Sequence, residues 1–203
     1  FSFTINQSPF PMPHRLLKPT LLFLASLTVI SGAAISPALP QMHAAFKDLP
    51  HADFLVRLVL TIPALFIAIL APLAGLMIDR FGRKPMLVIS LTLYGIAGTS
   101  GLFLDSLTHL LIARAFHGIA IAGLMPAVTT LVADYFSGEE RNRFMGQQSA
   151  FMALGGMVFI IVGGWLADFS WRGPFLVYAT AFLLLPVSMW VLHEPDRAAY
   201  QGA

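Results

Sequence analysis

Residues 75–85 form a short polar interruption between two long apolar segments, and they read Gly75-Leu76-Met77-Ile78-Asp79-Arg80-Phe81-Gly82-Arg83-Lys84-Pro85. Gly82 can adopt the positive φ that a tight turn requires, and Pro85 suits the first turn of a following helix. The stretch therefore predicts a hairpin turn that joins two helices at a membrane surface.

The charges and glycines of this turn indicate more than a surface loop. A basic loop facing an anionic lipid leaflet would account for the Arg and Lys residues at positions 80, 83 and 84. It would not account for Asp79, an acid just inside the helix end and within one helical turn of Arg83. Nor would it account for Gly75, which would allow close helix contact. These features point to a role beyond membrane topology.

The composition is that of a membrane protein. Of the 203 residues, 57% are hydrophobic and 11% are charged, and the mean hydropathy is +0.78, whereas soluble domains carry about 25% charged residues. These values exclude an ordinary cytosolic enzyme, a nucleic-acid-binding module and a disordered chain. The absence of cysteine excludes disulfides and thiol catalysis. Without a phosphate-binding glycine loop or metal-ligand spacing, we expect no cofactor, no metal and no ATP-driven pumping.

Six apolar segments are long enough to cross a bilayer core of about 30 Å. Of the 12 basic and 10 acidic residues, only Arg57 and Arg114 fall within them, because a charge at mid-membrane costs about 2.5–3.5 kcal/mol. We therefore predict an all-α membrane protein with six transmembrane helices. The segments are Leu21–Pro40, Phe54–Ile78, Met86–Leu104, Thr108–Val132, Met145–Ala167 and Phe175–Leu192.

Lys and Arg residues are distributed unevenly between the two sides of these segments, with eight on one side and three on the other. The positive-inside rule makes the richer side cytoplasmic, so both termini are expected in the cytoplasm, with the bundle in the inner or plasma membrane. We expect a cytoplasmic N-terminal tail over 1–20, a six-helix bundle over 21–192 and the start of a cytoplasmic linker over 193–203. Because the chain starts with Phe1 rather than Met, we expect a processed or truncated product.

The first three helices align with the last three when the sequence is shifted by 89 residues, so that Asp79 meets Asp168 and Arg83 meets Arg172. Three helices per unit is an odd number, so the second unit (about 108–192) would run through the membrane opposite to the first (about 21–104). Inverted three-helix repeats are typical of a large class of secondary transporters. The alternative is convergent turn chemistry at two helix ends.

Residues 75–84 closely resemble the signature loop of the major facilitator superfamily, G-x-x-x-D-x-x-G-R/K-R/K, at every fixed position. The resemblance covers about residues 18–195 and includes Pro37-Ala38-Leu39-Pro40, Arg114 with Gly118, and Trp171-Arg172 before Pro174-Phe175. It implies the N-terminal half of a twelve-helix transporter whose C-terminal six-helix half is absent from this chain. A small-molecule substrate would bind between the halves.

The resemblance also implies a gating role for the turn. In the family, the acid at the Asp79 position contacts the other half in the outward-open state, and the basic residues stabilise closure on the cytoplasmic side. The gating residues implied here are Gly75, Asp79, Arg80, Gly82, Arg83 and Lys84.

Arg114 is an ionisable residue inside the predicted fourth span, which makes it a functional candidate by default. His117 lies one turn further on the same face, where the family commonly has glutamine, and Gly118 follows it. We expect Arg114, His117 and Gly118 in a substrate or proton pathway, with the charge of Arg114 keeping His117 neutral at rest. The alternatives are packing, or an arginine that snorkels to the outer surface. No acid lies within the six spans. The titratable group for proton coupling would therefore have to be His117, Asp79 or a residue of the missing half; otherwise the carrier is not proton-driven.

The predicted cavity is apolar with sparse polar groups, which suits amphipathic or drug-like compounds and favours multidrug efflux. Family antiporters often have a Gly-Pro step in helix 5, where this chain has Phe159-Ile160 between two glycine pairs, so the antiporter subtype stays open. The alternatives are a dimerising half-size carrier and a non-transport six-helix membrane protein. An intramembrane protease is a remote alternative, because Gly98-Thr99-Ser100-Gly101 matches G-x-S-G. We favour helix packing for these small residues and expect no enzyme.

Overall fold

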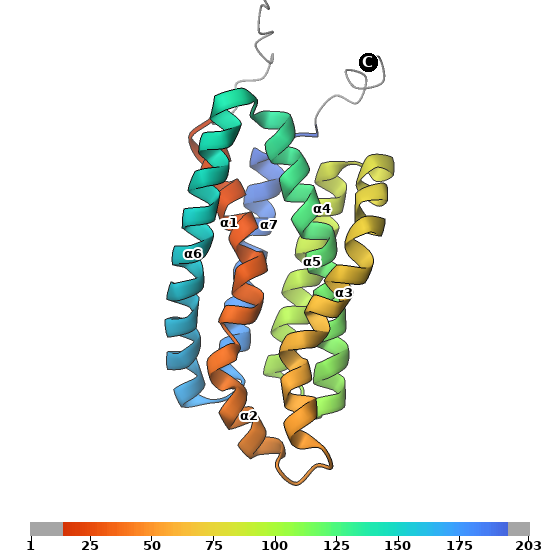
Figure 1. Cartoon of the computed structure of the whole chain (residues 1–203), viewed down its shortest axis with the longest axis vertical. Helices are drawn as coiled ribbons and strands as arrows, with labels where there is room; N and C mark the ends of the chain where they lie inside the picture. The colour runs from red at the N-terminus through yellow and green to blue at the C-terminus, as the bar shows by residue number, and fades with distance from the viewer. Residues whose placement is uncertain (1–13, 195–203) are drawn as a thin grey trace, which may run out of the picture.

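Within residues 14–194, the part of the chain that this computed structural model describes, six helices are long and apolar enough to cross a membrane. They lie side by side in one elongated bundle (Figure 1). The six helices confirm the predicted fold class, an all-α protein with six spans. The described part of the chain contains no strand. The elements in chain order are α1 (His14–Ala33), η1 (Ser36–Ala38), α2 (Leu39–Phe46), α3 (Ala52–Phe81), α4 (Arg83–Thr99), η2 (Ser100–Leu102), α5 (Leu107–Tyr135), α6 (Gly138–Phe169), η3 (Gly173–Ala179) and α7 (Thr180–Val191).

Several helices extend beyond the predicted apolar spans. The fifth long helix, α6, begins at Gly138 rather than Met145, because acids such as Glu139 and Glu140 favour the first turn of a helix although they are too polar for a spanning segment. The first helix begins at His14, so residues 14–20 of the expected tail are helical. The rest of that tail and the linker beyond Glu194 lie outside the described residues.

The first spanning segment is interrupted rather than terminated at its proline cluster. α1 ends at Ala33, a short 3₁₀ turn follows, and α2 carries the chain on to Phe46. Helical structure therefore continues past Pro40, the predicted end of this span. Pro37 is the second residue of η1, and Pro40 is the second residue of α2. A missing N–H costs little at the start of a helix. Pro37 cannot donate to the carbonyl of Ala33, which helps to end α1 there.

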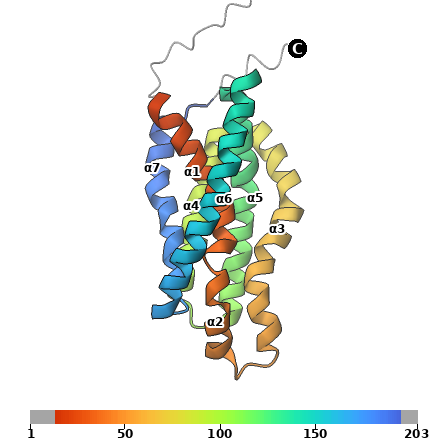
Figure 2. The ribbon, with the colours of Figure 1, turned by 60° about the vertical axis from the view of Figure 1, so that its left-hand side comes forward.

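The helix α5 lies in the centre of the bundle and packs most extensively against α3 and α4, while α1 packs against α6 (Figures 1 and 2). Glycines make these approaches possible. A β-carbon at Gly118 would lie 2.7 Å from the carbonyl oxygen of Pro63 in α3, and one at Gly163 would collide with the carbonyl of Ala34. Gly163 thus lets α6 approach the end of α1 closely.

The outer helices α3 and α6 bury a smaller share of their apolar stretch than α1 and α5 do. Large apolar side chains such as Leu76, Ile161 and Trp190 are exposed on the bundle. In a bilayer such surfaces are covered by lipid tails or by further protein.

The two halves of the bundle make related contacts at opposite ends, as the predicted inverted repeat requires. At the turn between α6 and η3, Arg172 pairs with Asp105. At the turn between α3 and α4, the backbone N–H of Arg83 donates to Glu194 over 2.9 Å. In the alignment with a shift of 89 residues, Arg83 corresponds to Arg172 and Asp105 corresponds to Glu194. Each contact therefore joins an arginine of one repeat to the acid at the corresponding place in the alignment. These turns lie at the upper and lower ends of Figure 1.

Candidate functional site

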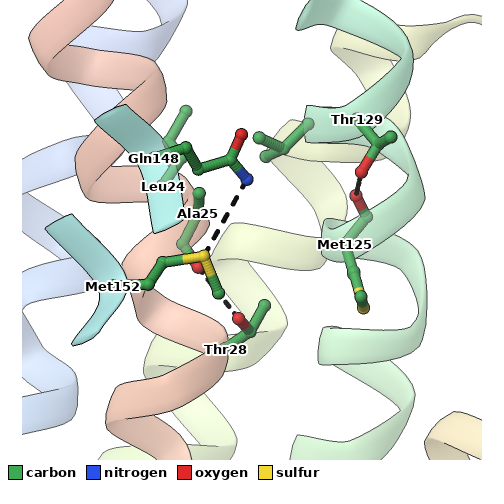
Figure 3. A pocket seen from close by; sticks show the side chains of 8 residues that line it. Leu24, Ala25, Thr28, Met125, Thr129, Gln148 and Met152 are labelled. Atoms are coloured by element: carbon green, nitrogen blue, oxygen red, sulfur yellow. Dashed lines mark hydrogen bonds between the residues drawn. The ribbon is translucent and has the colours of Figure 1, made fainter. Parts of the chain in front are cut away.

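A small pocket of about 40 Å³ opens between α1, α5 and α6 (Figure 3). Pockets that enclose drug-sized ligands measure about 300–1,000 Å³, so this pocket is too small to enclose such a ligand. We call the lining residues the α1/α5/α6 wall: Leu24, Ala25, Thr28, Met125, Val128, Thr129, Gln148 and Met152.

The wall is apolar and uncharged, with its polar groups partly used internally. The Thr28 hydroxyl donates to the carbonyl of Ala25 and the Thr129 hydroxyl to that of Met125, both over 2.9 Å. These hydroxyls therefore offer only lone pairs to the pocket. Gln148 Nε2 lies 3.9 Å from the thioether sulfur of Met152, and a thioether adapts readily to aromatic ligands. The wall suits an apolar ligand with few polar groups.

A second, larger hollow of about 370 Å³ lies beside the end of α2 and the start of α5. Phe46, Asp48 and Asp105 are among its lining residues. None of the predicted site residues line it.

Arg114 lies in the core of the bundle, 1% exposed, and lines neither pocket. The snorkelling alternative is therefore wrong. Its Nε donates to the carbonyl of Val59 over 3.0 Å, its Nη1 to the hydroxyl of Tyr178 over 3.1 Å, and its Nη2 to the carbonyl of Ser31 over 3.1 Å. None of the ion pairs found among residues 14–194 includes Arg114. Its charge is thus compensated by dipoles of α1, α3 and η3.

His117 is completely buried between two tyrosine rings, with centroid distances of 4.3 Å to Tyr94 and 4.6 Å to Tyr178. Both tyrosine hydroxyls donate over 2.7 Å to carbonyls of α1, Tyr94 to Leu27 and Tyr178 to Ser31. Neither ring nitrogen of His117 makes a hydrogen bond of good geometry to a described residue, although the backbone of Tyr94 lies close. The structure thus joins Arg114 and His117 through Tyr178.

The protease-like glycines are used for packing. A β-carbon at Gly98 or Gly101 would meet the ring of Tyr178 or Phe175 at less than contact distance, and the Ser100 hydroxyl donates to the carbonyl of Ala97 over 2.8 Å. These contacts support the expectation that the small residues of this stretch allow close helix packing.

The signature turn has the predicted backbone. Gly82 has a φ of 108°, and Pro85 lies in the first turn of α4. Since Gly82 has no side chain to cap the helix, the carboxylate of Glu194 accepts the free N–H groups of Arg83 over 2.9 Å and Lys84 over 2.7 Å. A carboxylate at a helix N-terminus is stabilised by these bonds and by the helix dipole.

Further contacts join the signature turn to α5 and to the end of α7. Arg83 Nε and Asp134 Oδ2 form an ion pair over 3.1 Å, with both side chains largely buried. Lys84 Nζ donates to the carbonyl of Met189 over 2.8 Å, and the Tyr135 hydroxyl donates to the carbonyl of His193. Three helix ends are thereby connected.

Asp79 and Arg80 differ from Arg83 and Lys84 in being exposed on the last turn of α3. Gly75 differs from the prediction, because a β-carbon there would meet no described atom within 4 Å. The expected close contact at Gly75 is therefore not made within the described part of the chain.

The chain is similar to proteins of a large transporter family. The family model of the Major Facilitator Superfamily matches residues 21–202. "Multidrug resistance protein 1" of Bacillus subtilis (strain 168) is 32% identical over 180 residues, which cover 88% of this chain and 46% of that protein. "Quinolone resistance protein NorA" of Staphylococcus aureus is 26% identical over 169 residues, covering 83% of this chain and 44% of NorA. The chain spans about half the length of these curated relatives.

Solved structures show the same arrangement of helices. The inward-open xylose transporter XylE from E. coli superimposes with a TM-score of 0.77 at 17% identity, over 92% of this chain and 50% of that one. A D-xylose-proton symporter gives a TM-score of 0.69 at 20% identity, over 90% of this chain and 48% of that one. With its signature turn, its six-helix bundle and the match of the family model over most of its length, the chain belongs to the Major Facilitator Superfamily.

Proposed function

We propose that this chain is one half of a secondary transporter that moves a small molecule across the membrane by alternating access. The observation that carries the proposal is the α1/α5/α6 wall, which is uncharged, apolar and far too small to enclose a ligand alone. A second six-helix half would complete the site, in keeping with the half-length coverage of the relatives. The protein is then a carrier and not an enzyme.

The proposed activity is efflux of amphipathic or drug-like compounds. The similarity to multidrug and quinolone resistance proteins supports this substrate class. So do the thioethers of the wall and its two threonine hydroxyls, whose protons already bond to backbone carbonyls. A half-size carrier that dimerises is the second candidate, since two copies of the wall would also enclose a site.

Gln148→Ala tests the wall, because Gln148 is the residue of the wall with both a donor and an acceptor. In the complete transporter, we expect the half-saturating concentration for efflux of a fluorescent amphipathic dye to change about three- to tenfold, the effect of one hydrogen bond. Gln147→Ala, an exposed neighbour outside the wall, is the control. Absence of dye efflux in the wild type, or equal effects of the two variants, would refute the proposal.

We propose further that Gly75, Asp79, Arg80, Gly82, Arg83 and Lys84 form the gating turn. Asp79 is exposed at the end of α3, available to a helix N-terminus of the second half, where the dipole favours an anion. Arg83 and Lys84 hold the other side of the turn on α5 and α7.

Asp79→Asn removes this charge at constant size. We expect membrane expression to persist and dye transport to fall about tenfold, the factor that corresponds to ~1.4 kcal/mol of lost interaction. Asp168→Asn, an exposed acid at the equivalent position of the second repeat, should transport normally. Normal kinetics in Asp79→Asn would contradict the gating role.

The proposed orientation places the signature turn, and both termini, in the cytoplasm of a cell whose inner or plasma membrane holds the protein. The positive-inside rule supports this orientation, because eight Lys and Arg residues lie on the side of the signature turn and three on the other side.

Single cysteines test this orientation on a background without native cysteine. Ser170 and Ser137 are exposed at opposite ends of α6. We expect Ser170→Cys to react with an impermeant thiol reagent outside intact cells and Ser137→Cys to react only after permeabilisation. The reverse pattern would overturn the orientation.

The final part of the proposal is that His117 takes part in proton coupling. The completely buried ring has no well-formed hydrogen bond to a described residue and lies beside the charged Arg114 network, so that an anionic ligand or a carboxylate of the second half would favour its protonation.

His117→Gln removes the titratable ring and supplies the residue common in the family. We expect the pH dependence of transport to flatten while substrate binding is retained. His109→Gln, an exposed histidine on the same helix, is the control. An unchanged pH profile in His117→Gln would remove the proton role from this half.

A further inference from the structure

One carbonyl of α3 lacks its helical donor because of a proline. In an α-helix the N–H of residue i donates to the carbonyl of residue i−4, and proline has no N–H. Pro63 lies inside α3, so the carbonyl of Val59 receives nothing from position 63. Val59 is completely buried, where water cannot replace the missing donor. Arg114 Nε, 3.0 Å away, donates to this oxygen.

A second carbonyl is left without a helical donor by the break in the first span. Position 35, which would donate to the carbonyl of Ser31, lies beyond the end of α1 at Ala33. Arg114 Nη2 donates to this oxygen over 3.1 Å, and the Tyr178 hydroxyl donates to it over 2.7 Å. One guanidinium thus donates to a carbonyl of each helix, α3 and α1, where the helical N–H donor is missing.

We propose that Arg114 is a positioning residue that replaces the backbone donors missing from α3 at Pro63 and from α1 at its break. Its planar fork can reach both carbonyls at once, which the single ammonium of lysine cannot do in the same geometry. By holding these two irregular points against α5, it fixes α1 relative to α3 inside the core.

This contact would also set the shape of the α1/α5/α6 wall. Ser31 lies about one turn beyond Thr28, which lines the wall on the same helix. A displaced Ser31 carbonyl would therefore displace Thr28. This last step rests on the proposed function, whereas the contact between Arg114 and the two carbonyls does not.

A suppressor experiment tests the proposal. Arg114→Gln removes the fork and should lower the midpoint of thermal unfolding of the full-length protein in detergent by about 5 °C or more. Pro63→Ala returns an N–H to position 63, so that Val59 no longer needs Arg114. We expect Pro63→Ala to recover about half of the loss in the Arg114→Gln background, because one of the two carbonyls is supplied again.

Pro72→Ala is the matched control, since Pro72 lies in the same helix but is exposed and away from Arg114. It should recover none of the loss. Equal unfolding midpoints for Arg114→Gln with and without Pro63→Ala, or equal recovery by Pro72→Ala, would overturn the proposal.

The comparison remains decisive if Arg114→Gln does not reach the membrane. The same variants are then scored by the yield of membrane-inserted protein, where recovery by Pro63→Ala alone supports the proposal and no recovery refutes it. Dye efflux by the wild type is measured separately. A failure there refutes the proposed function and leaves the stability comparison intact.

Discussion

A buried guanidinium without a carboxylate partner is the constraint around which this bundle is arranged. Placing an arginine at the centre of a spanning helix costs about 2.5–3.5 kcal/mol, so Arg114 must be surrounded by acceptors. Three elements supply them through Val59, Ser31 and Tyr178. Gly118, one turn further along α5, lets that helix approach the backbone at Pro63. The glycine and the arginine therefore act together, since the close approach brings Arg114 within reach of α3.

The inverted repeat explains why the remaining charges gather at the two ends, but the ends are not equivalent. At one end Arg172 uses its side chain to pair with Asp105. At the other, Arg83 offers its backbone to Glu194 and its side chain to Asp134. Among the described residues, the position thus contacts one acid in the second repeat and two in the first. The additional acid, Asp134, joins the signature turn to α5.

The parts of the fold that residue type specifies could be predicted from the sequence, whereas the side-chain contacts to main-chain carbonyls could not. The six spans and the positive φ of Gly82 follow from apolar length and turn chemistry. The partners of Arg114 are mostly main-chain carbonyls, which any residue type would present, so no sequence signal identified them. Glu194 is a different case: the 89-residue shift relates it to Asp105, so its contact with the turn could have been found.

The interrupted first span separates a segment held by buried side-chain hydrogen bonds from one held by apolar packing. The carbonyls of Leu27 and Ser31 accept hydrogen bonds from Tyr94, Tyr178 and Arg114, so the portion of α1 that lines the wall is bound to the core. Among the described residues, the stretch from Ala34 to Pro37 has no side-chain hydrogen bond to α5. Ala34 and Ile35 are completely buried in the apolar core, and Ala34 and Pro37 lie against Gly163 and Gly164. The wall cannot shift without breaking buried hydrogen bonds. In the proposed transport cycle, this geometry would favour movement of the six-helix half as a rigid body.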